Sequence, residues 1–181
     1  ILENLSQVYM QTGKHKKAIE CLDGAFELAK KVEDNRAQGV ILKKMGDYHI
    51  SLKEYSKAIE KYERGLPKIR KVANLPLEYA LLENLGNAYL EISGHEKSLI
   101  CFRHSRSLGK KHFDRYMEAR AVWNMSRTCQ QSGESAEALS YAELASKLCS
   151  GSLDANIKNL EEKIKEWMIS RVADEIKDSG L

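Results

Sequence analysis

Residues 82–102 read LENLGNAYLEISGHEKSLICF, which is two helical segments joined by a short turn. Apolar and small residues recur in the first segment at i, i+3, i+4 and i+7, the spacing of one helix face, at Leu82, Leu85, Gly86 and Tyr89. A second such face begins at Ser98 and includes Phe102. Glycine inside a helix costs about 0.5–1 kcal/mol relative to alanine. We therefore expect close packing at Gly86 to offset that cost.

The pattern recurs with a 40-residue period over residues 1–150. The small residue that opens the second face is repeated at Ala18, Ala58, Ser98 and Ala138. The position of Gly86 is small in every copy, at Ser6, Gly46, Gly86 and Ser126. Each unit is therefore predicted to be a helix A, a turn and a helix B, with the two small residues allowing the backbones to approach closely. Three of the turns contain a glycine (Gly13, Gly94 and Gly133), predicted to adopt the left-handed conformation at the end of helix A.

This pattern resembles the tetratricopeptide repeat, whose signature places Leu-Gly, Tyr, Ala, an aromatic residue and Ala at fixed offsets. The third unit matches at Leu85-Gly86, Tyr89, Ser98 and Phe102, and the second at Met45-Gly46, Ala58 and Tyr62. The fourth unit is weaker, although Ala138 matches. The unit length of 40 residues is similar to that of a subset of tetratricopeptide repeat proteins. That subset includes spindle-orientation adaptors, a Tonsoku-like histone-binding scaffold and a ciliary dynein-docking subunit, and kinesin light chains have related units.

The resemblance implies an all-α fold, a right-handed superhelical solenoid of antiparallel helix pairs with a C-terminal helix. We predict four hairpins over about residues 1–33, 34–73, 74–113 and 114–150. After Ser150 the 40-residue pattern is predicted to stop, and residues 151–181 are predicted to form one long helix with Asp154 as a candidate N-cap. This helix either caps the array or docks on another chain, including a second copy, and exposure of Trp167 would favour docking.

Two prolines bear on the helix boundaries. Pro67 falls late in helix B of the second unit, where a proline removes a backbone donor and is predicted to kink or end the helix. Pro76 is predicted to open helix A of the third unit.

Composition limits the class of protein. The chain has 181 residues, 43% hydrophobic and 30% charged, so it can bury a core, and its net charge of +3 is too small to imply nucleic acid. No run of 18 apolar residues occurs, so no membrane partner is predicted. The N-terminus begins mid-pattern without Met, and we expect a fragment of a longer protein. We predict reduced thiols and a cytoplasmic location, with cytoskeletal, ciliary or nuclear association open, from the four cysteines Cys21, Cys101, Cys129 and Cys149.

The sequence predicts no enzyme, no catalytic residue and no cofactor. P-loop, HExxH, CxxC and GxSxG motifs do not occur in it, and no nucleophile, base and orienting group can be assembled. Cys101 and His104 lie three residues apart, but zinc needs three or four ligands, so no metal site is predicted. The basic segments at 13–17 and 108–112 are predicted to be solvated turns and helix ends.

The resemblance implies that the A helices of this chain line a concave groove, where a peptide or a partner helix would bind. Candidate groove residues are the polar positions of helix A that do not face helix B: Asn4, Gln7, Lys43, Lys44, Asp47, Glu83, Asn84, Asn87, Arg120, Asn124 and Arg127. Asn4, Asn84 and Asn124 share one repeat position, and their amides could both donate to and accept from a peptide backbone. The basic members favour an acidic ligand. Alternatively, all of these residues are ordinary polar surface.

The predicted function is a non-catalytic scaffold or adaptor that binds a partner peptide or helix in this groove. One alternative is a structural subunit of a larger cytoskeletal or ciliary assembly, which would use the convex face and the C-terminal helix. A nucleic-acid-binding helical repeat is the other alternative, and a steep salt dependence of binding would reveal it.

Overall fold

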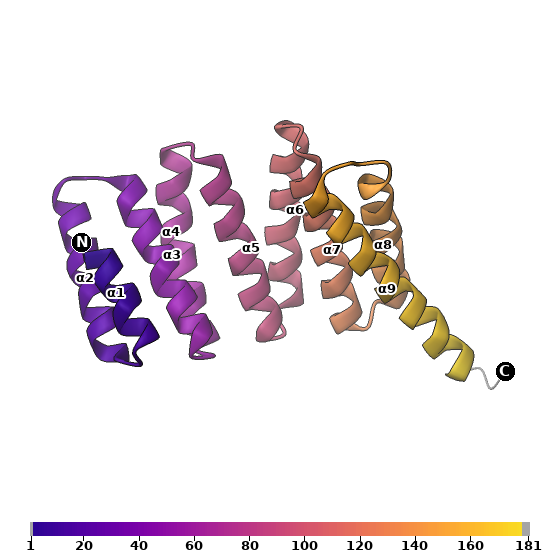
Figure 1. Ribbon diagram of the computed structural model, residues 1–181, viewed down its shortest axis with the longest axis horizontal. Helices are drawn as coiled ribbons and strands as arrows, with labels where there is room; N and C mark the ends of the chain where they lie inside the picture. The colour runs from indigo at the N-terminus through magenta and orange to yellow at the C-terminus, as the bar shows by residue number, and fades with distance from the viewer. Residues whose placement is uncertain (1, 179–181) are drawn as a thin grey trace. The chain divides into compact units, whose positions relative to one another are not determined.

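The computed structural model describes residues 2–178, without the side chains of residues 2–4, 11, 172 and 174–178. This part of the chain contains nine α-helices and no strand (Figure 1). The helices are α1 (Leu2–Gln11), α2 (His15–Lys31), α3 (Asn35–Ser51), α4 (Tyr55–Lys71), α5 (Leu75–Glu91), α6 (His95–Lys111), α7 (Arg115–Ser132), α8 (Ser135–Cys149) and α9 (Ala155–Asp178).

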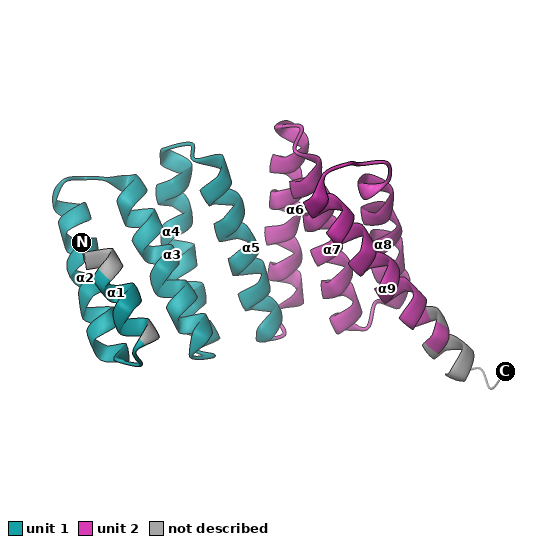
Figure 2. Cartoon of the chain, viewed as in Figure 1, with its two compact units in different colours: residues 1–92 teal, residues 93–181 magenta. Residues whose placement is uncertain are grey.

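The chain forms two compact units, Ile1–Ile92 (unit 1) and Ser93–Leu181 (unit 2), shown in Figure 2. In unit 1, α1 pairs with α2 and α3 with α4, while α2 packs on α3 and α4 on α5. Helices α3 and α5, which are both A helices, also touch. In unit 2, α6 packs on α7, α7 on α8, and α9 on both α7 and α8. Within each unit, the helices therefore pack mainly on their neighbours in sequence, as in a helical repeat.

The seven turns from α1 to α8 recur at every twentieth position of the chain. At each turn one residue has a positive φ, between 51° and 87°: Gly13, Glu33, Lys53, Ala73, Ser93, Phe113 and Gly133. This conformation lets backbone N–H groups beyond the helix bond its last carbonyls, as Asp34 N–H does to Ala29 O at 2.9 Å. The predicted left-handed glycines are found at Gly13 and Gly133. The prediction is wrong at Gly94, which has a φ of −82° because the preceding Ser93 takes the left-handed position.

The starts of the A helices recur with the 40-residue period of the sequence pattern. Four side chains accept a hydrogen bond from the backbone N–H three residues later, at 2.8–3.1 Å: Asp34, Asn74, Asp114 and Asp154. Asp154 therefore caps α9 as predicted. The prediction that the 40-residue pattern stops after Ser150 is wrong at this position, because α9 begins where helix A of a fifth unit would begin.

The two prolines behave differently. Pro76 lies in the first turn of α5, after the cap Asn74, as predicted. Pro67 lies inside α4, which continues to Lys71, so of the two predicted alternatives, a kink or an end of the helix, the second is wrong. The physical reason is tertiary packing, because Ile69 follows the proline and is completely buried. Ile69 packs directly against Gly39 of α3. A Cβ built on Gly39 would lie only 2.3 Å from the Cδ1 atom of Ile69, so the absence of a side chain on Gly39 makes room for Ile69.

The residues predicted for the repeat core are all buried: Gly46, Ala58, Gly86, Tyr89, Ser98, Phe102 and Ala138. At Gly46 the closest neighbour is an aromatic ring, since a Cβ there would lie 2.3 Å from Cε1 of Tyr62. At the equivalent pair in unit 2, the Ser126 hydroxyl donates to the backbone carbonyl of Ala138 at 2.6 Å. One small-residue position thus accommodates a ring in one hairpin and a direct helix-to-helix hydrogen bond in another.

Helix α9 contributes Ile157, Leu160 and Ile164 to the core of unit 2. Trp167 is half-buried there. Its indole N–H donates to Oε1 of Gln130 at 2.6 Å, and its ring meets Trp123 edge to face with centroids 5.5 Å apart. The exposed Trp167 that would favour docking is therefore not observed. No helix among the described residues is long and apolar enough to cross a membrane.

Candidate functional site

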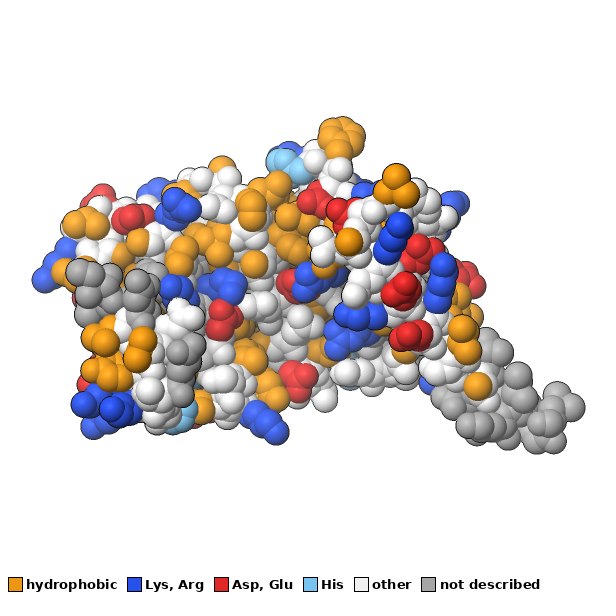
Figure 3. Space-filling model, in the orientation of Figure 1, with side chains coloured by type: hydrophobic (Ala, Val, Ile, Leu, Met, Phe, Trp, Pro, Cys, Tyr) orange, Lys and Arg blue, Asp and Glu red, His pale blue; other side chains and the backbone are white. Residues whose placement is uncertain are grey.

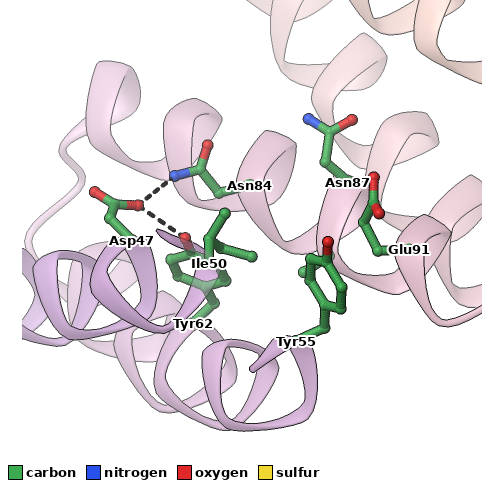
Figure 4. Close-up of a pocket in the computed structure, with 8 residues that line it drawn as sticks. Asp47, Ile50, Tyr55, Tyr62, Asn84, Asn87 and Glu91 are labelled. Carbon is green, nitrogen blue, oxygen red and sulfur yellow. Dashed lines mark hydrogen bonds between the residues drawn. The ribbon is translucent and has the colours of Figure 1, made fainter. Parts of the chain in front are cut away.

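The carboxylate of Asp47 is the polar centre of unit 1. Its Oδ1 atom accepts hydrogen bonds from the Tyr62 hydroxyl at 2.8 Å and from the Asn84 amide at 2.7 Å (Figure 4). Its Oδ2 atom pairs with the Lys43 ammonium at 2.7 Å. Tyr62 comes from α4 and Asn84 from α5, so one side chain of α3 connects three helices. Burial and the negative charge of Asp47 raise the pKa of Tyr62, so its hydroxyl stays protonated and remains a donor at neutral pH.

A pocket of about 330 Å³ opens beside Asp47, and we call it the α3–α5 pocket. It is lined by Asp47, Ile50, Tyr55, Tyr62, Asn84, Asn87, Ala88 and Glu91. Figure 4 shows Asp47 and Asn84 on one side, with Tyr55, Asn87 and Glu91 on the other. Burial raises the pKa of Tyr55, and a hydrogen bond and the charge of Glu91 add to this effect. The pocket therefore combines carboxylates, amides and phenols with an apolar wall.

A second pocket of about 510 Å³ involves α1 and α3, and we call it the α1–α3 pocket. It is lined by Ser6, Gln7, Met10, Lys44, Asp47, Tyr48 and Ser51. Asp47 belongs to both pockets, so they adjoin along the A helices of unit 1. The second pocket has the more apolar lining, with Met10 and the ring of Tyr48 between polar side chains.

The structure brings together five of the predicted groove residues at these pockets: Gln7, Lys44, Asp47, Asn84 and Asn87. Lys43 contributes through its ion pair with Asp47. Glu83 is buried, with 9% of its surface exposed, and does not line either pocket. The side chain of Asn4 lies outside the described residues.

The predicted groove residues of unit 2 all lie on α7. The Arg120 guanidinium donates to the Tyr116 hydroxyl at 3.0 Å and lies 5.7 Å from the centre of that ring. Arg127 donates to the Asn124 side-chain oxygen at 3.4 Å, and Asn124 is itself buried. Of the predicted asparagine row, Asn84 and Asn124 are therefore held by hydrogen bonds within the chain.

Sequence reasoning missed four residues of the α3–α5 pocket: Ile50, Tyr55, Glu91 and Ala88, which directly follows the predicted Asn87. Ile50 lies three residues after Asp47, and Glu91 lies four residues after Asn87, so both continue the same helix faces into the last turn. Extending the helical spacing by one turn would have identified them. Tyr55 is the first residue of α4 and joins the pocket through tertiary packing, for which the sequence contains no signal.

The chemistry available at these pockets is hydrogen bonding, ion pairing and apolar contact. Among the described residues, no three His, Cys, Asp or Glu side chains are grouped to hold a metal ion. The four cysteines are free thiols. Burial, with a contribution from Glu134, raises the pKa of Cys129 to about 11, and burial with Glu161 does the same for Cys149, so both thiols are protonated and poorly nucleophilic at neutral pH.

The first 71 residues match the tetratricopeptide repeat family. No curated protein matches the chain. Tetratricopeptide repeats generally mediate protein–protein interaction, and their fold is typically non-catalytic.

Solved structures support the fold over nearly the whole chain. A signal-transduction ATPase with a tetratricopeptide repeat sensor from Pyrococcus horikoshii has a TM-score of 0.76 at 20% identity, covering 89% of this chain and 24% of that one. The chain therefore spans about a quarter of that protein. The apo form of RapI has a TM-score of 0.75 at 14% identity, covering 98% of this chain and 70% of RapI. The tetratricopeptide-like repeats of a putative kinesin light chain from Podospora anserina have a TM-score of 0.69 at 14% identity, covering 98% of this chain and 94% of that one.

The prediction of an all-helical tetratricopeptide-like solenoid is confirmed by these neighbours. The assignment to the subset with 40-residue units stays a prediction, because it depends on spacing in the sequence.

Proposed function

We propose that the chain is a non-catalytic interaction module that binds a segment of a partner protein along the A helices of unit 1. The observation that carries this proposal is the pair of adjoining pockets that share Asp47. Both pockets are lined in part by residues that the sequence predicted from their repeat position on helix A. A bound segment could place one side chain in each pocket while its backbone bonds the amides between them.

The preorganisation of the α3–α5 pocket supports the proposal. Tyr62, Asn84 and Lys43 hold the Asp47 carboxylate through three contacts of 2.7–2.8 Å. A ligand that meets side chains already fixed in place loses less binding free energy to ordering them. Asn87 lines the same pocket and supplies an amide that can both donate and accept.

The expected charge of the partner differs from one helix to another. The positive charge of Lys43 is paired with Asp47, so it offers little to an acidic ligand in unit 1. Arg127 in unit 2 bonds the neutral amide of Asn124 and keeps its charge for a ligand. We therefore restrict the proposed acidic preference to the surface of α7 near Arg127.

The proposed function is tested by filling the α3–α5 pocket. The full chain, its Asn87→Trp variant and the control Glu20→Trp are used as bait in cell extract, and captured proteins are quantified by mass spectrometry. Glu20 is exposed on the B helix α2, away from both pockets. We expect Asn87→Trp to lower recovery of specific partners about tenfold while the control retains them. Equal recovery with a folded Asn87→Trp variant would refute the proposal.

A further inference from the structure

We infer that the α3–α5 pocket holds the cationic side chain of an arginine or lysine from the bound segment. This inference rests on the proposed function and specifies the chemistry of the partner at one pocket. The charge of this side chain is opposite to that of the acidic ligand predicted from the basic groove residues.

The charge balance of the pocket is the first argument. Two carboxylates line it, Asp47 and Glu91. Asp47 is balanced by the Lys43 ammonium at 2.7 Å, whereas Glu91 is exposed and has no ion pair with any residue that the structure describes. The pocket therefore carries one uncompensated negative charge. An acidic side chain would be repelled there, and a neutral one would leave the charge of Glu91 unbalanced.

The pattern of hydrogen-bonding groups is the second argument. Asp47 accepts two hydrogen bonds at Oδ1 and pairs with Lys43 at Oδ2, whereas Glu91 accepts a hydrogen bond from Tyr55 and keeps further acceptor capacity. Figure 4 shows Asn87 and Tyr55 beside Glu91, each with an oxygen that can accept. A guanidinium group has five N–H donors and no acceptor, and its fork matches a carboxylate. An ammonium group would satisfy fewer of these oxygens.

The walls of the pocket are the third argument. Ile50 and the ring of Tyr55 are partly exposed and suit the methylene stem of a long cationic side chain, while Ala88 and Tyr62 contribute buried lining atoms. Tyrosine faces also attract a cation through their quadrupole. The volume of about 330 Å³ is small for a ligand pocket, and it suits one long side chain better than a whole peptide segment.

The charge preference can be measured without knowing the partner. The probes are N-acetyl-arginine N-methylamide and its neutral isostere N-acetyl-citrulline N-methylamide, titrated into the 15N-labelled full chain. We expect saturable shifts of the Asn87 and Ala88 signals, with the arginine compound binding about fivefold more tightly. Glu91→Gln should abolish this preference, and the control Glu20→Gln should retain it. Equal affinity of the two probes, or no shift at Asn87, would overturn the inference.

A random peptide library selected on the full chain separates the inference from the proposed function. We expect selected peptides to share an arginine or lysine whose replacement by norleucine weakens binding about tenfold, and Glu91→Gln to weaken binding similarly. Peptides that depend on Asn87 but contain no required cation would overturn the inference and leave the function intact. A library without any peptide sensitive to Asn87→Trp would overturn both.

Discussion

At the scale of single residues, the chain tolerates strain at regular intervals. Of the seven evenly spaced turn residues with positive φ, five are not glycine. The left-handed conformation costs a non-glycine residue about 1–2 kcal/mol. The turns are retained because they close short connections between helices whose packing is worth more. Phe113 is the extreme case, with a φ of 55° and 94% of its surface exposed.

Replacing one of these residues by glycine should stabilise the protein. Ala73 has a φ of 51° and is exposed between α4 and α5. We predict that Ala73→Gly raises the free energy of unfolding by about 0.5–1 kcal/mol, because relief of strain outweighs the greater entropy of unfolded glycine. Denaturant unfolding measures this. Ala136→Gly, at an exposed helical position in α8, should be destabilising instead. If both variants lose stability, the turn at Ala73 is not strained.

Gly46 should not tolerate even one added methyl group. A Cβ there would lie 2.3 Å from the ring of Tyr62, which is fully buried and anchored through its hydroxyl to Asp47. The ring cannot yield without weakening that hydrogen bond. We predict that Gly46→Ala lowers the free energy of unfolding by about 1–3 kcal/mol, as measured by denaturant unfolding.

Gly24 provides the matched control for this change. It is exposed within α2, so Gly24→Ala should raise the free energy of unfolding by about 0.5–1 kcal/mol through helix propensity alone. Two substitutions of the same kind should thus have opposite signs. A Gly46→Ala variant with stability equal to the wild type would mean that the ring moves freely.

At the scale of helices, the A helices and α9 share one kind of start. Asp or Asn caps α3, α5, α7 and α9, whereas α2, α4, α6 and α8 have no side-chain cap bond at their N-caps. The buried face of α9 nevertheless differs from that of the other A helices. Its buried residues Ile157, Leu160 and Ile164 correspond to Met117, Arg120 and Asn124 of α7. Asn124 is also buried, whereas Met117 and Arg120 are only half-buried, so α9 keeps the start of an A helix and buries a face that only partly overlaps that of α7.

The packing of α9 predicts the effect of removing its tryptophan. Trp167→Ala would remove the ring contact with Trp123 and the hydrogen bond to Gln130. Because the side chain is only half-buried, we predict a loss of about 2 kcal/mol in the free energy of unfolding, less than for a fully buried tryptophan. Ile169, which is 70% exposed on the same helix, is the control, and Ile169→Ala should have little effect. Equal effects of the two substitutions would show that α9 is not anchored through Trp167.

At the scale of the whole molecule, charge is distributed rather than concentrated. Figure 3 shows basic and acidic side chains interspersed over the face in view. Many basic groups are also paired with acidic ones: Lys43 with Asp47, Arg64 with Glu60, Arg70 with Glu78, Arg106 with Glu118, and Lys165 with Glu161. Such pairs contribute little to stability at exposed positions. They do reduce the positive charge available to a phosphate backbone.

The charge distribution predicts weak binding to nucleic acid. We expect the chain to bind duplex DNA with a Kd weaker than about 10⁻⁴ M at roughly 150 mM salt, because acidic side chains are interspersed among the basic ones and the net charge is only +3. Fluorescence anisotropy with a labelled duplex, repeated at several salt concentrations, is the measurement. Tight binding with a steep dependence on salt would instead support the nucleic-acid alternative.

The sequence by itself determined the repeat and the helices of this protein. Helical spacing, small residues and capping side chains act within a few residues of one another, so a 40-residue pattern predicts A and B helices. It also located five polar residues at the two pockets, since the outward face of an A helix follows from periodicity. Contact with distant helices lies beyond such local rules, which is why the continuation of α4 through Pro67 was not foreseen.

Only the tertiary structure decided the character of the site. Asp47, Tyr55 and Glu91 come from three different helices, and their meeting depends on how α3, α4 and α5 pack. Lys43 and Asp47 neutralise each other, and Glu91 gives this pocket a negative charge instead of the positive one expected from the basic groove residues. Net charge at a site depends on which side chains face one another in space, and spacing along the chain contains little of that information.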